Sequence, residues 1–391
     1  MAQSYRYISG DSHLEVDSKV WIDRVPNEHR DRAPRLVRTA DGADAWLVEG
    51  VPLRQNASDI YGGKGRDEWQ PFGQRYEDTP GTGPAEQRIR EQDTDGIDAE
   101  VLFPGQQAGP RLWRSIADDE AYRSVVRAYN DFLAEDYCSV APDRLIGVGV
   151  IPWSGLDHAM AEIEHCAKAG LKAIVLGTFP SGKGYPTPED DRFWAAAVDL
   201  GIAVTVHVEF DRQGERAGSL FRYARVPKQL QATRGSGIVE QLTNDKFCRL
   251  GAANAVQLIF AGVFDRFPTL RVDFAENQIG WIPFFLEMAD VRYERHRHWA
   301  QRLMDVPPLA RRPSEYIREH CYWGFQHDRV GVELRNHLGV DRVIWATDFP
   351  HQESDWPNSI EVVDESFAGV PLDERYAMVA GNAIEFFHLN R

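Results

Sequence analysis

The sequence predicts an α/β fold, specifically a (β/α)8 TIM barrel with two insertions, and three observations support it. Short apolar runs alternate with longer amphipathic stretches along the 391 residues, a pattern that indicates parallel βαβ units. Eight such runs can be assigned, which suits a barrel whose core needs about 250 residues. Two long segments, at about 17–83 and 211–251, remain after the first and fifth runs. We therefore expect residues 1–391 to form a single barrel domain carrying these insertions.

The predicted strands and helices follow one another in chain order. Gly201 and Pro268 supply helix stop signals, and the seventh strand has the least distinctive pattern. The predicted strands are 5–12, 99–103, 145–151, 171–176, 202–208, 270–275, 321–325 and 342–347, and the predicted helices are 84–96, 118–141, 156–169, 190–200, 252–267 and 328–338.

Composition restricts the class of partner. The formal net charge is -16, whereas binding to a nucleic-acid backbone needs clustered Lys and Arg. The same charge argues against an anionic membrane surface. No segment reaches the roughly 18 consecutive apolar residues of a membrane span. We expect a small-molecule substrate, with no nucleic-acid and no membrane partner.

Cysteine usage and the first residues indicate the compartment. Cys138, Cys166, Cys248 and Cys321 are widely separated and form no CxxC pair, as expected for buried thiols in a reducing environment. Residues 1–7 lack an apolar core of signal-peptide length. These features predict a cytoplasmic protein.

Polar residues at the ends of the predicted strands are the candidates for chemistry, because catalytic groups of a parallel barrel lie where strands end. Asp11 and His13 are two residues apart on the first strand, so their side chains can converge. His207 lies near the end of the fifth strand. Each residue alone fits a structural role, such as a core histidine or a helix cap.

The sixth and eighth strands add further ionisable groups. Glu276 follows the sixth strand, and Asp348 and His351 follow the eighth. Buried carboxylates need partners, and a divalent ion would serve all of these groups at once. Mixed imidazole and carboxylate ligands suit Zn2+, and they are compatible with Mn2+ or Fe2+.

The sequence resembles the amidohydrolase superfamily, specifically the amidohydrolase 2 branch, which includes the aminocarboxymuconate-semialdehyde decarboxylase-like enzymes. The resemblance covers nearly the whole barrel, and it depends on the order and spacing of several motifs together. These are Gly10-Asp11-Ser12-His13, residues 128–133 and 141–145, residues 264–268, Phe274-Ala275-Glu276 with residues 280–283, and residues 346–351.

The resemblance implies one divalent metal ion held by Asp11, His13, His207 and Asp348, with Zn2+ as our first choice. The sequence departs from the commonest pattern, His-x-His, because Asp11 occupies the first position. It also has Glu276 where decarboxylases of the group often have His, so a role borrowed from that His is in doubt.

The main functional expectation is hydrolysis of a small cyclic or aromatic amide, ester, lactone or ketone by attack of a metal-activated water. Asp348 is the expected general base, since it can bind the metal weakly and still accept a proton. Glu276 or His351 would then protonate the leaving group, although His351 could instead fix its loop.

The alternative is non-oxidative decarboxylation of an aromatic or unsaturated carboxylic acid, with Asp348 donating a proton to carbon. A charge count favours hydrolysis, because three ionised carboxylates around one divalent ion disfavour an anionic substrate. A basic residue from an insertion, such as Arg54, Arg212 or Arg216, would weaken this argument. A third hypothesis is a barrel that binds a small molecule without catalysis. It is disfavoured because every expected metal-ligand position holds a polar residue.

Four residues after predicted strands are the candidates for substrate binding: Trp153, Phe179, Gln326 and His327. Their alternative role is ordinary packing. In the first insertion, Trp46 and Trp69 could close over the site or pack on a neighbouring subunit. From the resemblance we expect a homodimer or a higher homo-oligomer.

Overall fold

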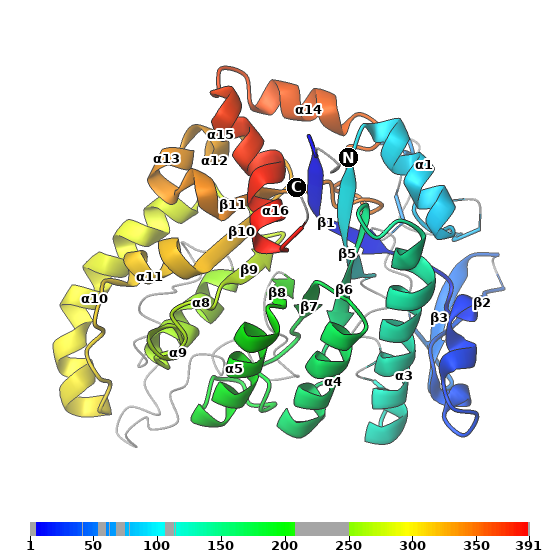
Figure 1. The fold of residues 1–391 in the computed structure, drawn as a ribbon, viewed down its shortest axis with the longest axis horizontal. Helices are drawn as coiled ribbons and strands as arrows, with labels where there is room; N and C mark the ends of the chain where they lie inside the picture. Colours follow the sequence, from blue (N-terminus) through cyan, green and yellow to red (C-terminus); the bar gives the residue numbers. More distant parts are fainter. Residues whose placement is uncertain are drawn as a thin grey trace.

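The computed structural model contains an eight-stranded parallel sheet whose strands lie in chain order (Figure 1). It describes residues 5–40, 42–53, 60–61, 63–67, 75–77, 79–105, 113, 115–207 and 250–389, and the statements below concern these residues. The predicted (β/α)8 barrel is thereby confirmed, including its doubtful seventh strand. The strands are β1 (Ile8–Leu14), β5 (Ala99–Pro104), β6 (Leu145–Val150), β7 (Ala173–Val175), β8 (Ala203–His207), β9 (Val272–Ala275), β10 (Cys321–Phe325) and β11 (Val343–Trp345).

Backbone hydrogen bonds between β1 and the segment after β11 bring the two ends of the sheet together. The amide of Asp348 donates to the carbonyl of Asp11 at 2.9 Å, and the amide of His13 donates to the carbonyl of Phe349 at 2.8 Å. Gly10 makes this approach possible, because a Cβ atom there would lie 2.1 Å from Cγ2 of Ile344. The same hydrogen bonds fix two of the predicted site segments against each other.

Helices surround the barrel, and several differ from the prediction (Figure 1). The predicted helix 252–267 is divided at Gly262, which has a left-handed φ of 69°. The helix α10 was not predicted, because its charged second half obscures the apolar spacing of its first half. The helices are α1 (Ala85–Asp95), α3 (Asp119–Phe132), α4 (Leu156–Lys168), α5 (Asp191–Leu200), α8 (Leu250–Phe260), α9 (Val263–Arg266), α10 (Ile282–Met304), α11 (Pro313–His320), α12 (Arg329–Glu333), α13 (Arg335–Leu338), α14 (Ser359–Ser366), α15 (Leu372–Tyr376) and α16 (Asn382–Phe386).

A second, antiparallel sheet lies between β1 and α1 in the chain. Its strands β2 (Arg35–Arg38), β3 (Asp44–Val48) and β4 (Val51–Leu53) pair in the order β2-β3-β4. Trp46 on β3 is fully buried, and its indole N–H donates to the hydroxyl of Tyr76 at 3.0 Å. Most of the second predicted insertion, 211–251, lies outside the described residues, as do Trp69, Arg54, Arg212 and Arg216.

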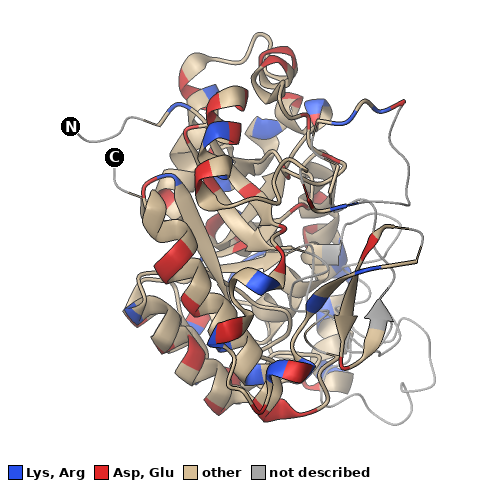
Figure 2. Cartoon of the chain, turned by 90° about the vertical axis from the view of Figure 1, so that its right-hand side faces the viewer, with Lys and Arg blue, Asp and Glu red and all other residues tan. Residues whose placement is uncertain are grey.

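The surface and thiols agree with an ordinary globular chain. Figure 2 shows Asp and Glu intermixed with Lys and Arg along the outer helices. Cys138, Cys166 and Cys321 are buried free thiols, whereas Cys248 lies outside the described part. Among the helices that the structure describes, none combines the length and the apolar character needed to cross a membrane.

Candidate active site

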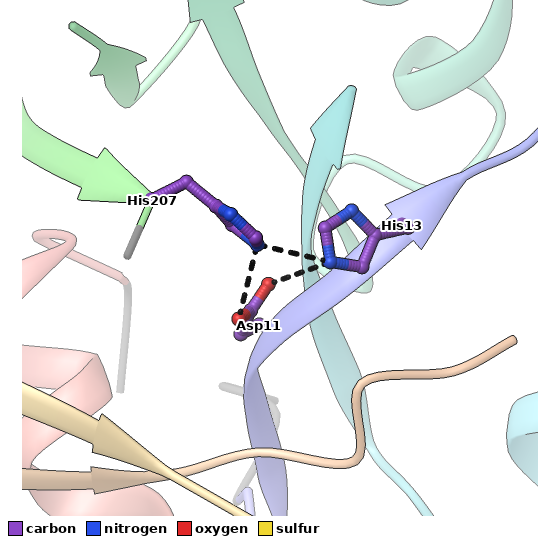
Figure 3. Close-up of side chains that lie close together, drawn as sticks. All are labelled: Asp11, His13 and His207. Atoms are coloured by element: carbon purple, nitrogen blue, oxygen red, sulfur yellow. Dashed lines mark hydrogen bonds and ion pairs between the residues drawn. The ribbon is translucent and has the colours of Figure 1, made fainter. Parts of the chain in front are cut away.

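Three predicted residues converge at the ends of β1 and β8, as Figure 3 shows. The Nε2 atoms of His13 and His207 lie 3.2 Å apart. The carboxylate oxygens of Asp11 lie 3.4 Å from Nε2 of His13 and 3.6 Å from Nε2 of His207. The side chains of Asp11 and His13 are buried, while that of His207 is 20% exposed. The cluster is therefore accessible from the side of His207.

Asp348 and His351 join this cluster from the segment after β11. Oδ1 of Asp348 lies 3.0 Å from Nε2 of His13 and 3.1 Å from Nδ1 of His351. The imidazole of His351 stacks on that of His13, with centroids 3.8 Å apart and an angle of 18° between the planes. Nε2 of His351 hydrogen-bonds to the carboxylate of Glu15 at 3.0 Å. His351 thus lies between two carboxylates.

Two of the site carboxylates lie on residues with a left-handed backbone. Glu276 has a φ of 56° and Asp348 has a φ of 54°, a region that residues other than glycine seldom adopt. The carboxylate of Glu276 is 3.7 Å from Nε2 of His207. Backbone strain of this kind is most common at functional sites, where the surrounding structure maintains it. Here it turns both carboxylates toward the histidine cluster.

Burial and neighbouring charges shift the pKa values of these groups. Burial raises the pKa of Asp11 well above its usual range, and the nearby carboxylates of Asp348 and Glu276 raise it further. Burial alone would lower the pKa of His351, but Asp348 and Glu15 hold it well above its usual value. The charge count that favoured hydrolysis left out His351 and its contacts with Asp348 and Glu15, so that count was incomplete.

The arrangement fits a divalent metal ion. Neither carboxylate oxygen of Asp11 has a hydrogen-bond partner among the described residues, although both are buried. The Nε2–Nε2 distance of 3.2 Å is close to the roughly 3.3 Å between two nitrogens bound to one tetrahedral Zn2+. Nδ1 of His13 lies 3.3 Å from the carbonyl of Pro104, a contact that leaves Nε2 of His13 free to bind a metal.

The four candidates for substrate binding have different environments. Trp153 and Phe179 are buried after β6 and β7, and the ring of Trp153 packs against Gly177. His327 is exposed, whereas Gln326 is buried and accepts a 2.6 Å hydrogen bond from Gln278. Nε2 of Gln326 and Oε1 of Gln278 are buried without a hydrogen-bond partner in the described structure. Gln326 therefore combines burial with a donor that has no hydrogen-bond partner among the described residues.

Sequence reasoning missed one buried residue that holds the site segments together. Arg88 on α1 donates to the backbone carbonyls of His13 and Phe349, each at 3.0 Å. It also makes a two-point ion pair with Glu100 on β5, at 2.7 and 3.1 Å. The sequence does show polar residues on the helix that contains Arg88, and this helix must face a barrel strand. The partners of Arg88 could not be identified, because they are distant from it in the chain.

The amidohydrolase family model matches residues 29–389, which is most of the chain and includes every barrel strand except β1. The chain belongs to the amidohydrolase family. It is therefore related to enzymes, and the family resemblance of the sequence is confirmed.

Several amidohydrolase relatives are decarboxylases. The chain is 26% identical over 326 residues to a gamma-resorcylate decarboxylase of Rhodococcus jostii, covering 78% of this chain and 87% of the relative. It is 25% identical over 308 residues to 2-amino-3-carboxymuconate-6-semialdehyde decarboxylase of Dictyostelium discoideum, covering 78% and 76%. The fold also matches a dihydroxybenzoic acid decarboxylase of Polaromonas with bound manganese and 2-nitroresorcinol, with a TM-score of 0.60, 17% identity and coverage of 99% and 98%.

These relatives contradict the main functional expectation. Hydrolysis of an amide, ester, lactone or ketone was expected, whereas the named relatives remove carbon dioxide from carboxylic acids. The expectation was wrong because it depended on a count of ionised carboxylates. That count left out His351 and its contacts with Asp348 and Glu15. The decarboxylase alternative fits the relatives better.

Proposed function

We propose that this amidohydrolase is a metal-dependent decarboxylase of a small aromatic or unsaturated carboxylic acid. One observation carries the proposal: two imidazole nitrogens 3.2 Å apart face a buried aspartate whose oxygens lack hydrogen-bond partners in the described part of the chain. This is the donor set of a divalent metal site. The decarboxylase relatives support the reaction class.

In this proposal Asp11, His13, His207 and Asp348 hold one ion. Burial lowers the pKa of His13, so this imidazole is neutral and its Nε2 can donate a lone pair. Bound metal would also supply the partner that the two buried oxygens of Asp11 need. When bound, a divalent ion supplies Lewis-acid charge that attracts the substrate's carboxylate and a neighbouring hydroxyl oxygen.

The two carboxylates in the donor set bear on which ion is bound. Carboxylate oxygens suit Mn2+, whereas imidazole nitrogens suit Zn2+. Because Asp11 replaces the first histidine of a His-x-His pattern, we expect Mn2+ in preference to the Zn2+ of our first expectation. The manganese in the Polaromonas structure supports this choice. Elemental analysis of the purified protein distinguishes Mn2+, Zn2+ and Fe2+.

Asp348 is the residue that we propose donates the proton. Asp348 transfers its proton to the ring carbon that bears the carboxylate, and a pair of ring π electrons forms the new C–H bond. The bond to the carboxylate carbon then breaks, its electron pair restores the aromatic ring, and carbon dioxide leaves. Asp348 takes up one proton before the next turnover, so each cycle consumes one proton. Glu276 and His351, close to His207 and Asp348 respectively, are the other catalytic candidates.

Gln326 is the residue that we propose recognises the substrate, together with Gln278. A buried donor or acceptor without a partner costs about 1–3 kcal/mol, so a ligand that satisfies it binds more tightly. Nε2 of Gln326 can donate to a carboxylate or phenolate oxygen, and Oε1 of Gln278 can accept from a hydroxyl group. Trp153, Phe179 and His327 stay candidates for the walls of the same site.

The test is an assay that follows carbon dioxide release and hydrolysis separately. The probes are 2,6-dihydroxybenzoate and 5-carboxyvanillate, with benzoate as a control that lacks the neighbouring hydroxyl group. We expect carbon dioxide from at least one hydroxylated acid and none from benzoate. Hydrolysis of ester or lactone probes without carbon dioxide from any acid would overturn the proposal. Homo-oligomer formation, which sedimentation measures, and a cytoplasmic location stay predictions.

A further inference from the structure

A chain of buried polar side chains links the antiparallel β2–β4 sheet to the candidate active site. The indole N–H of Trp46 donates to the hydroxyl of Tyr76 at 3.0 Å, and this hydroxyl donates to the carboxylate of Glu15 at 3.4 Å. The other oxygen of Glu15 accepts from His351 at 3.0 Å, and His351 lies 3.1 Å from Asp348. All five side chains are buried. We call this set the Trp46–Asp348 chain.

The outer end of the Trp46–Asp348 chain is fixed by the β2–β4 sheet. The backbone N–H of Tyr76 donates to the carboxylate of Asp44 on β3 at 2.8 Å. That carboxylate also forms a 3.0 Å ion pair with Arg38 on β2. Trp46 and Tyr76 meet edge to face, with centroids 5.8 Å apart. The position of the Tyr76 hydroxyl is therefore set by two strands of this sheet.

Glu15, in the middle of the chain, has little freedom to move. Its residue is fully buried, so its carboxylate depends on protein groups for hydrogen bonds. Gly105 lies directly against it, because a Cβ atom at that position would be 2.4 Å from the carboxylate atoms. Packing on this side and the two hydrogen bonds hold the Glu15 carboxylate in one orientation.

The inner end of the chain restricts His351 and thereby Asp348. The ring of His351 is stacked 3.8 Å from that of His13, and its Nε2 is held by Glu15. These two contacts determine where Nδ1 points, which is toward Oδ1 of Asp348. The same oxygen faces Nε2 of His13 at 3.0 Å. A displaced His351 would leave this oxygen without one of its two fixed neighbours.

We propose that Glu15 and Tyr76 are positioning residues for Asp348, acting through His351. The β2–β4 sheet is then a fixed part of the active site, and Trp46 does not serve as a mobile cover or a subunit contact. This inference rests on the proposed function for its effect on turnover. Its effect on metal binding does not, because metal affinity is measured without any substrate.

The experiment compares Tyr76→Phe with Tyr293→Phe. Both tyrosines are 4% exposed, and the hydroxyl of each makes a hydrogen bond. The hydroxyl of Tyr293 accepts from the amide of Leu309 at 2.7 Å. Tyr293 lies on α10, and its hydroxyl accepts from a residue of the loop that follows this helix. Both substitutions remove one hydroxyl group, so a general loss of stability should affect both variants similarly.

We expect Tyr76→Phe to lower kcat about tenfold with little change in KM, and to weaken Mn2+ binding to the metal-free protein several-fold. Glu15→Gln should have the larger effect on both, about 10–100-fold. Tyr293→Phe should leave kcat and Mn2+ affinity unchanged. Mn2+ affinity is measured by competition with a chelator on folded protein, as judged by circular dichroism.

The outcomes separate the two proposals. Equal kcat and equal Mn2+ affinity in Tyr76→Phe, Tyr293→Phe and the unmodified protein would overturn the positioning role. If Glu15→Gln fails to fold, Tyr76→Phe alone decides the question. A chain that binds Mn2+ more weakly after Tyr76→Phe, yet releases no carbon dioxide from any probe, would support the positioning role while contradicting the proposed decarboxylase function.

Discussion

At the scale of single residues, the site depends on Asp348 more than on any other side chain. Its carboxylate faces both His13 and His351, its backbone amide binds the carbonyl of Asp11, and its φ is left-handed. Such a residue can serve as a weak metal ligand, and we propose that it is also the proton donor, although His351 and His13 outweigh the effect of burial and hold its pKa well below its usual range. These two roles make different demands on the carboxylate, since an amide oxygen can still bind a metal but an amide cannot give up a proton to carbon.

Asp348→Asn should therefore separate binding from turnover. We expect kcat to fall at least about 100-fold, the usual range for loss of a general acid. Bound metal should be largely retained. Asp265→Asn, at an exposed position on α9, is the matched control and should leave kcat unchanged. Turnover of Asp348→Asn within a few-fold of the unmodified protein would remove Asp348 as the proton donor.

At the scale of secondary structure elements, Arg88 connects α1 to three parts of the barrel. Its guanidinium binds Glu100 on β5, the carbonyl of His13 on β1 and the carbonyl of Phe349 after β11. It also lies over the ring of Phe349, 4.5 Å from the centroid. Because β1 and the segment after β11 carry three of the proposed ligands, this helix supports the geometry of the site.

Arg88→Met should cost about 3–5 kcal/mol of stability, because it leaves the buried carboxylate of Glu100 without its charged partner. Glu100→Gln added to Arg88→Met should recover part of this loss. The double variant should still be less stable than the unmodified protein, since the two carbonyls lose their donor. Urea unfolding of the two single variants and of the double variant measures these changes in the free energy of unfolding. If the stability losses of the two single variants add up to the loss in the double variant, Arg88 and Glu100 are not energetically coupled.

Secondary structure elements were more predictable from the sequence than the contacts between them. The eight strands, the main early helices and the residues at strand ends could be predicted because apolar periodicity and β-branched runs are local signals. The contacts of Glu15, Tyr76 and Arg88 could not, since each joins segments that are distant in the chain. The reaction class was also misjudged, because the charge balance depends on the environment of His351. Local patterns locate candidate residues, but only packing reveals their partners.

At the scale of the whole molecule, stability should respond to pH through a carboxyl group that is not among the proposed metal ligands. Asp95, the last residue of α1, accepts from the amide of Ser359 at the start of α14 at 2.9 Å. Burial raises the pKa of Asp95 to about 6, although the hydrogen bonds from Ser359 oppose this shift. The folded chain therefore keeps a proton that the unfolded chain has already released.

It follows that Asp95 should contribute a fall in the free energy of unfolding as pH rises from about 4 to about 6. The contribution of Asp95 to this fall is on the order of 2–3 kcal/mol. Asp95→Asn keeps an acceptor for Ser359 and should remove that part of the slope, while raising stability at pH 7. Glu86→Gln, at an exposed position on the same helix, is the control. Urea unfolding at several pH values measures the slope, and an unchanged slope in Asp95→Asn would contradict this account.

The measurement that tests the central claim most directly is metal content and carbon dioxide release determined on one preparation. The unmodified protein and His207→Ala are each analysed for bound metal, and each is assayed with 2,6-dihydroxybenzoate and 5-carboxyvanillate. We expect about one equivalent of divalent metal and carbon dioxide release from the unmodified protein, and the loss of both in His207→Ala. Full metal content in His207→Ala, or carbon dioxide release without metal, would contradict the account.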